Sequence, residues 1–230
     1  MELNSQMYKM RDEYDTLFRQ CVSLNTELHK LEPLARQMHL LSSNAISSAA
    51  RAGSEGDAFR VLTQDIQLLG EEVSACIQDT QKAIGHIVML ASNLANLFGR
   101  YIKYCDLLQQ VQNQDDENYS ETFISATLTD LTEEIRQQGY QLATSIRRLQ
   151  ILLSPLSMLV KKGQYLAVYS SVEAASAGEH GIGFESVART LKELVKKLGE
   201  QSTRQQSLLR DLTEGMEKLQ FNQRIRRYAC

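Results

Sequence analysis

A seven-residue spacing of apolar side chains runs without interruption from Phe59 to Val111. Apolar residues return at alternating steps of three and four, the spacing of a helix that buries one face in a left-handed coiled coil. At about 1.5 Å per residue, such a helix is a rod of roughly 80 Å. The same spacing also runs through residues 7–49, 135–174 and 184–212. The pattern therefore predicts an all-α fold built from four long helices.

Two glycine-rich windows interrupt this spacing, one near residues 52–57 and one near residues 177–183. The second window repeats the first at an offset of 125 positions, which relates Gly53 to Gly178 and Phe59 to Phe184. Glycine allows a chain to reverse between two helices without strain. The sequence therefore predicts a tandem repeat of two helical hairpins.

The register of the core positions predicts how the helices pair. Folding at the first window places Ala49 opposite Phe59 and Cys21 opposite Ile87. A hairpin alone leaves the flanks of its apolar face exposed, whereas two hairpins side by side cover each other. We expect a long antiparallel four-helix coiled-coil bundle. Residues 1–113 form the first hairpin, 114–118 the linker and 119–230 the second, with both halves in one bundle.

Two features weaken the pattern locally. Pro33 and Pro155 each lie inside a predicted helix, where proline removes a hydrogen bond and favours a mild bend. The last helix carries Gln201 and Gln205 at core positions, which predicts looser packing there.

The composition indicates which kinds of partner and which cellular compartment to expect. A formal net charge of −3 gives no electrostatic footprint for nucleic acid. The polar amino terminus does not read as a secretory signal, and no apolar stretch approaches the roughly 20 residues that span a bilayer. We expect a cytoplasmic protein with no direct membrane insertion. The four cysteines lack the spacing of disulfide frameworks or zinc sites.

Residue types that carry chemistry do not form a recognisable constellation. The four histidines are scattered, and the sequence contains no nucleophile–base grouping, phosphate-binding loop or metal-ligand spacing. We therefore predict that the protein is not an enzyme and has no catalytic residues, metal or cofactor.

The two glycine windows carry a family resemblance. The segments "LARQMHLLSSNAISSAARAGSEGDAFRVLTQDIQLLG" (34–70) and "LAVYSSVEAASAGEHGIGFESVARTLKEL" (166–194) resemble the signalling tip of bacterial methyl-accepting chemotaxis receptors. In that family, two subunits each contribute one cytoplasmic hairpin, and the tip binds a coupling protein and a histidine autokinase. The resemblance implies a single-chain pseudo-dimer of two such hairpins.

The resemblance also implies a function and a set of interacting residues. It implies an interaction protein of a bacterial chemosensory pathway that docks coupling protein, histidine autokinase or chemoreceptors. The residues implied for this contact are Gln37, Asn44, Arg51, Gly53, Glu55, Phe59, Glu173, Gly178, Glu179, Gly181 and Phe184.

Departures from the family pattern keep other functions open. Ser48 and Ser54 stand where the family has glutamates, and Arg36 and Lys161 stand at its bulky receptor–receptor contact position. An alternative function is therefore a structural coiled-coil scaffold or adaptor that has lost kinase binding. A membrane-remodelling helical rod is a third option, which the acidic balance and the polar outer faces disfavour.

Overall fold

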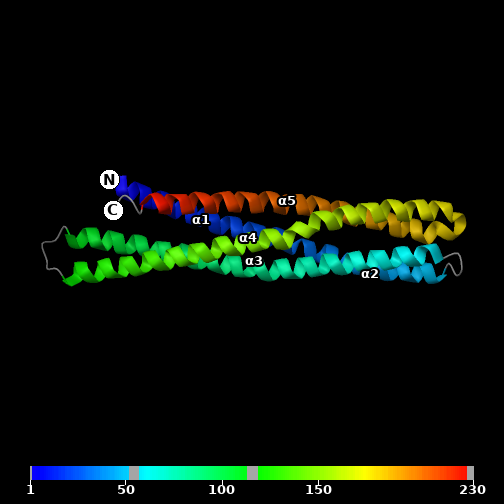
Figure 1. The fold of residues 1–230 in the computed structure, drawn as a ribbon, viewed down its shortest axis with the longest axis horizontal. Helices are drawn as coiled ribbons and strands as arrows, with labels where there is room; N and C mark the ends of the chain where they lie inside the picture. Colours follow the sequence, from blue (N-terminus) through cyan, green and yellow to red (C-terminus); the bar gives the residue numbers. More distant parts are fainter. Residues whose placement is uncertain (1, 52–56, 113–118, 227–230) are drawn as a thin grey trace. The chain divides into compact units, whose positions relative to one another are not determined.

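The computed structural model describes residues 2–51, 57–112 and 119–226. In chain order these residues form α1 (Glu2–His29), α2 (Leu31–Arg51), α3 (Asp57–Gln112), α4 (Tyr119–Ser176), the short 3₁₀ helix η2 (Gly178–Gly181) and α5 (Ile182–Arg226) (Figure 1). The described residues contain helices and no strand, as the apolar spacing predicts. None of these helices has a stretch long and apolar enough to cross a lipid bilayer.

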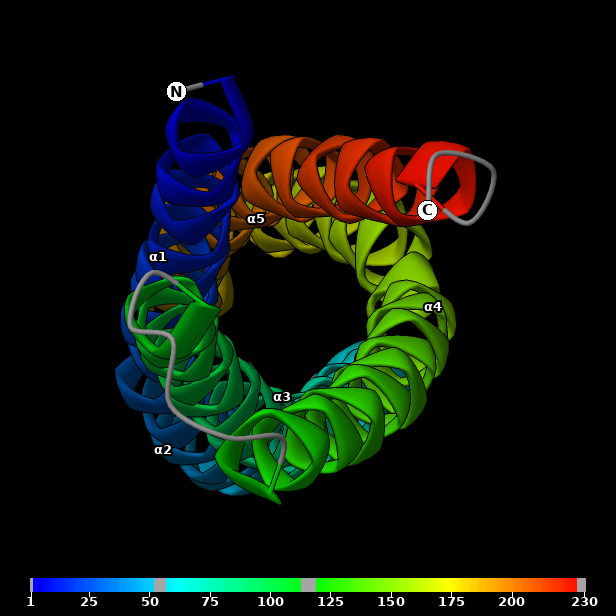
Figure 2. The same cartoon turned by 90° about the vertical axis from the view of Figure 1, so that its left-hand side faces the viewer.

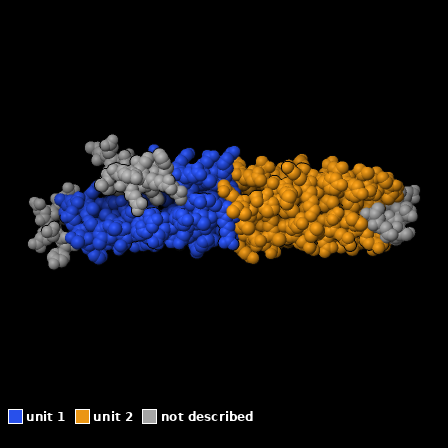
Figure 3. Space-filling view, viewed as in Figure 1, with its two compact units in different colours: residues 1–25, 83–148, 208–230 blue, residues 26–82, 149–207 orange. Residues whose placement is uncertain are grey.

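The chain divides into two compact units (Figure 3). Unit 1 comprises residues 1–25, 83–148 and 208–230, and unit 2 comprises residues 26–82 and 149–207. Each unit therefore takes segments from both halves of the chain. The antiparallel hairpin pairing and the division at residues 113 and 119 stay predictions.

Unit 1 packs segments of α1, α3, α4 and α5 around a shared core, seen from its end in Figure 2. Tyr14 of α1 lies against Phe98 of α3, with ring centroids 4.7 Å apart. Leu142 of α4 and Leu212 of α5 are fully buried. Burying large apolar side chains from all four segments is the main contribution to the stability of such a core.

Unit 2 packs α2 and parts of α3, α4 and α5 in the same way. Many of its buried apolar side chains fall on the predicted core positions, and these include Met38, Ala45, Ala49, Leu62, Ile66, Val73, Leu153, Leu156, Ala167, Leu191 and Leu198. Others, such as Ile77, Leu159 and Val195, are buried at positions beside the predicted ones. The predicted core position Gln205 is also fully buried although it is polar. The seven-residue spacing therefore identified the buried faces of these helices correctly.

The two prolines have different effects on their helices. Pro33 lies in the first turn of α2, where its missing N–H costs little, and α1 has already ended at His29. The chain is thus interrupted at Lys30 rather than mildly bent. Pro155 lies inside the continuous helix α4. It cannot donate to the carbonyl of Ile151, but the Ser154 hydroxyl donates to that carbonyl at 2.8 Å.

Candidate docking surface

We call the tip the end of unit 2 where α2 ends, α3 begins and α4 turns into α5. The turn from α4 to α5 depends on two glycines. Gly178 has a φ of +55°, the left-handed region that L side chains rarely adopt. A Cβ atom at Gly181 would lie 1.9 Å from the carbonyl oxygen of Ala174. Gly178 is therefore favoured by its backbone conformation, and Gly181 is required by the close approach of the chain to itself.

An aromatic pair joins the helices that leave the two glycine windows. Phe59 in the first turn of α3 and Phe184 in the first turn of α5 are each 1% exposed. Their rings stack with centroids 3.6 Å apart and an interplanar angle of 20°. The two phenylalanines, which hold the same position after each glycine window, are therefore in direct contact. Both rings serve the core of the tip, so neither is available for direct contact with a partner.

A groove of about 490 Å³ lies between α2 and α5 beside the tip. Three residues of the predicted site line it from α2, namely Gln37, Asn44 and Arg51. They follow one another at seven-residue intervals, so they form one row along the helix. The rest of the lining consists of Leu40, Leu41 and Ser48 from α2, and Gly183, Ser186, Val187, Thr190 and Leu194 from α5.

The chemistry of this groove suits protein contact. Its wall combines amide and hydroxyl groups with apolar side chains, and Leu40 is 66% exposed there. Gly183 of α5 faces Ser48 of α2, since a Cβ atom at this glycine would lie 3.4 Å from the Ser48 hydroxyl oxygen, an ordinary contact distance. Arg51 supplies a positive charge at the tip end of the row. Such a wall offers hydrogen bonds at its polar positions and an apolar anchor at Leu40.

Glu173 lies outside this groove lining, on α4. Its negative charge and its hydrogen bond with the Tyr169 hydroxyl raise the pKa of Tyr169 above its usual value. Tyr169 in turn stacks on Tyr165, with ring centroids 6.0 Å apart. The structure therefore places Glu173 beside an exposed aromatic pair rather than with Gln37, Asn44 and Arg51.

The remaining predicted site residues have separate positions. Gly53 and Glu55 lie outside the described residues, and Glu179 lies in η2. The residues that α5 contributes to the groove, such as Ser186 and Thr190, were not among the predicted ones. Pairing helices within each half could not find them, since α2 and α5 belong to different halves.

Chemical groups elsewhere in the described residues do not form a metal site, because no three His, Cys, Asp or Glu side chains are placed to hold an ion.

Cys21 is fully buried, and this burial raises its thiol pKa to about 12. A thiol with so high a pKa is a poor nucleophile at neutral pH.

Comparison with known proteins gives one weak relationship and no family model. No family model matches the chain. Over 90 residues, 39% of its length, the chain is 26% identical to a Pseudomonas aeruginosa protein described as methyl-accepting chemotaxis protein CtpL. The match covers 14% of that relative, so the chain spans a small part of its length. This similarity supports a chemoreceptor-like region in the chain.

Proposed function

We propose that this chain is a non-enzymatic, chemoreceptor-like interaction protein of a bacterial chemosensory pathway. It acts in the cytoplasm and docks a coupling protein, a histidine autokinase or both through its tip. In this proposal the two halves are tandem hairpins, and the single chain takes the place of a receptor dimer. The observation that carries the proposal is that Gln37, Asn44 and Arg51 line one groove beside the tip.

The groove supports docking for a physical reason. It is bounded by two helices, and it combines a row of hydrogen-bonding side chains with the exposed side chain of Leu40. A partner that fills it gains apolar burial and hydrogen bonds together, the usual composition of a protein interface. The similarity to a chemotaxis receptor over part of the chain favours chemosensory proteins as those partners.

The test uses two threonines of α5 that differ in one respect. Thr190 lines the groove, whereas Thr203 is not part of its lining. Both are exposed, and both donate their hydroxyl to the carbonyl four residues earlier, at 2.9 Å and 3.0 Å. Thr190→Lys inserts a long charged side chain into the groove, and Thr203→Lys makes the same change elsewhere on the helix.

The measurement is binding of the purified wild-type chain and both variants to the coupling protein and histidine autokinase of the source organism. We expect micromolar binding by the wild type, a loss of about tenfold or more for Thr190→Lys and no change for Thr203→Lys. Equal binding by both variants rejects the groove as the docking surface. No binding by the wild type rejects the proposed function.

A second candidate function is a structural scaffold or adaptor without kinase binding. Ser48 favours it, because this residue lines the groove at a position where the receptor family has a glutamate. Under this alternative the wild-type chain captures neither coupling protein nor kinase. Restoring the carboxylate with Ser48→Glu distinguishes the two, since recovered binding shows that the missing charge abolished docking.

A further inference from the structure

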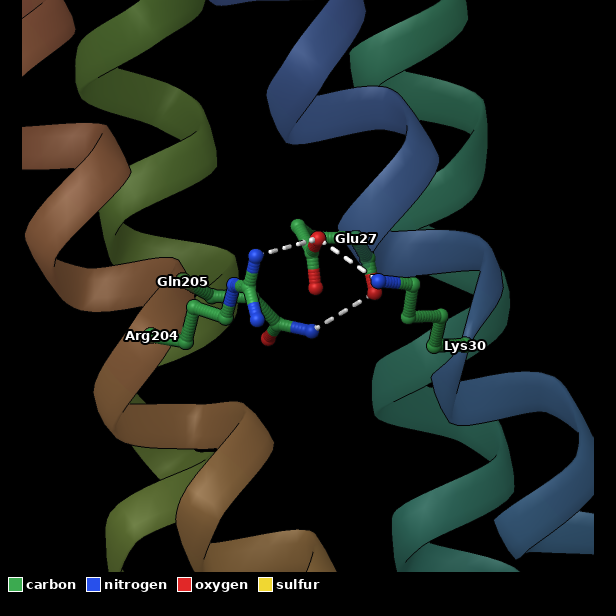
Figure 4. Close-up of polar contacts among 4 residues, drawn as sticks. All are labelled: Glu27, Lys30, Arg204 and Gln205. Atoms are coloured by element: carbon green, nitrogen blue, oxygen red, sulfur yellow. Dashed lines mark hydrogen bonds and ion pairs between the residues drawn. The ribbon is translucent and has the colours of Figure 1, made fainter.

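A polar cluster lies inside unit 2 where α1 gives way to α2. It consists of Glu27, Lys30, Arg204 and Gln205 (Figure 4). Glu27 is 5% exposed and Gln205 is fully buried. Buried glutamate and glutamine are uncommon in helical cores, since their polar atoms lose contact with water.

The interruption at Lys30 creates an unusual set of contacts at the end of α1. The Glu27 carbonyl accepts the Lys30 N–H at 3.2 Å, a bond between residues three apart that departs from the α-helical pattern. The same carbonyl accepts Nε2 of Gln205 at 3.3 Å from α5. A side chain of α5 therefore binds the backbone at the point where α1 ends.

The carboxylate of Glu27 adds a second link to α5. Its Oε1 atom lies 2.7 Å from Nζ of Lys30 and 3.2 Å from a guanidinium nitrogen of Arg204. Lys30 belongs to the interruption between α1 and α2, whereas Arg204 belongs to α5. One carboxylate oxygen thus joins the helix junction to the opposite helix.

The cluster also contains atoms that are not satisfied in the closed arrangement. Oε2 of Glu27 and Oε1 of Gln205 are buried without a hydrogen-bond partner. Each such atom opposes burial, because water would hydrogen-bond to it if it were exposed. The tip shows the opposite situation, since the Phe59 and Phe184 rings gain from exclusion of water.

We propose that this polar cluster is a latch at which α5 separates from the α1–α2 junction while the tip stays closed. Separation hydrates the two unsatisfied oxygens, which offsets part of the cost of breaking the Gln205 and Arg204 contacts. The interruption at Lys30 helps, because the end of α1 can move without bending a continuous helix. This opening is independent of which partner the tip binds.

The test is amide hydrogen exchange of the full chain, followed by mass spectrometry of its peptides. We expect residues 26–34 and 200–209 to exchange faster than residues 59–66 and 184–191 at the tip. Gln205→Leu loses the bond to the Glu27 carbonyl, but that carbonyl still accepts the Lys30 N–H. Because the variant also removes an unsatisfied oxygen and adds apolar contact, it is expected to slow exchange at the latch about tenfold. Gln206→Leu makes the same change at an exposed neighbour and is expected to leave these rates unchanged.

A second variant tests the same idea in the opposite direction. Arg204→Gln removes the link to Glu27 and is expected to speed exchange in residues 26–34 and 200–209 several-fold, without changing the tip. Arg210→Gln, on the next turns of α5, is the matched control. Equal exchange at latch and tip in the wild type overturns the proposal, and so does a uniform change across unit 2 in either latch variant.

Discussion

Two helix contacts in unit 2 use opposite residue sizes at matching positions. Between α2 and α3, Met38 packs over Gly70, and a Cβ atom at Gly70 would lie 3.7 Å from Cβ of Met38. Between α4 and α5, the glycine is Gly163 of α4 and the larger residue is Val195 of α5. Each residue of the second pair lies 125 positions after its counterpart in the first.

The comparison shows that a close helix contact can place its small residue on either of the two helices. Helices approach closely when a small residue of one faces a larger residue of the other. Met38–Gly70 and Gly163–Val195 both meet this condition, but the small residue lies on α3 in the first pair and on α4 in the second. The second contact is also tighter, since a Cβ atom at Gly163 would lie 2.5 Å from Cγ2 of Val195 and 3.1 Å from Cδ2 of Leu69.

The largest effect is expected when Gly163 is replaced by methionine, the residue found 125 positions earlier at Met38. Gly163→Met places a long side chain against Val195 and Leu69 and is expected to lower the free energy of unfolding by about 3 kcal/mol or more. Chemical denaturation followed by circular dichroism measures this change. The control is Gly85→Met in α3, where a Cβ atom would meet nothing within 4 Å. Similar stability of the two variants would show that α4 and α5 have room to separate.

A smaller substitution at Gly163 tests whether Val195 limits the space at this site. Gly163→Ala is expected to cost about 1–2 kcal/mol, because valine is stiff and its methyl group cannot easily move away. In the double variant with Val195→Ala, the clash disappears and the total loss is expected to be less than the sum of the two single losses. Additive losses in this double-mutant cycle would mean that the contact with Val195 does not limit the site.

The smallest effect is expected in the first contact, and it has the opposite sign. Gly70→Ala places its Cβ atom in ordinary contact with Met38, at 3.7 Å, while alanine favours a helix more than glycine does. We expect the variant to be more stable by about 0.5–1 kcal/mol, measured as a raised denaturation midpoint. Destabilisation would show that α2 and α3 lie too close for even a methyl group.

The fold was predictable where periodicity determines burial. Residues such as Cys21, Leu24, Ile66 and Leu69 are buried where the seven-residue spacing places them. Periodicity does not specify which helix of a pair carries the larger side chain. The opposite arrangements of Met38–Gly70 and Gly163–Val195 could therefore not be predicted. The helix interruption at Lys30 was also missed. Proline is well accommodated in the first turn of a helix, and the sequence did not show that a new helix begins just before Pro33.

The candidate site was predictable only along single helices. The resemblance to the receptor tip implied Gln37, Asn44 and Arg51, and the structure brings all three into one groove. Their neighbour across the groove is α5, which comes from the other half of the chain. Glu173 was implied by the same resemblance, but it lies beside Tyr169 on α4 and is not part of the groove lining.

The close approach of Gly181 to Ala174 also has a use in recognising relatives. No residue with a Cβ atom fits there without moving the backbone, because the nearest carbonyl oxygen is only 1.9 Å away from where that atom would be. A homologous sequence with a larger residue at this position must therefore form a different turn. This single position can separate proteins that share the geometry of the turn from those that share only the heptad pattern of their helices.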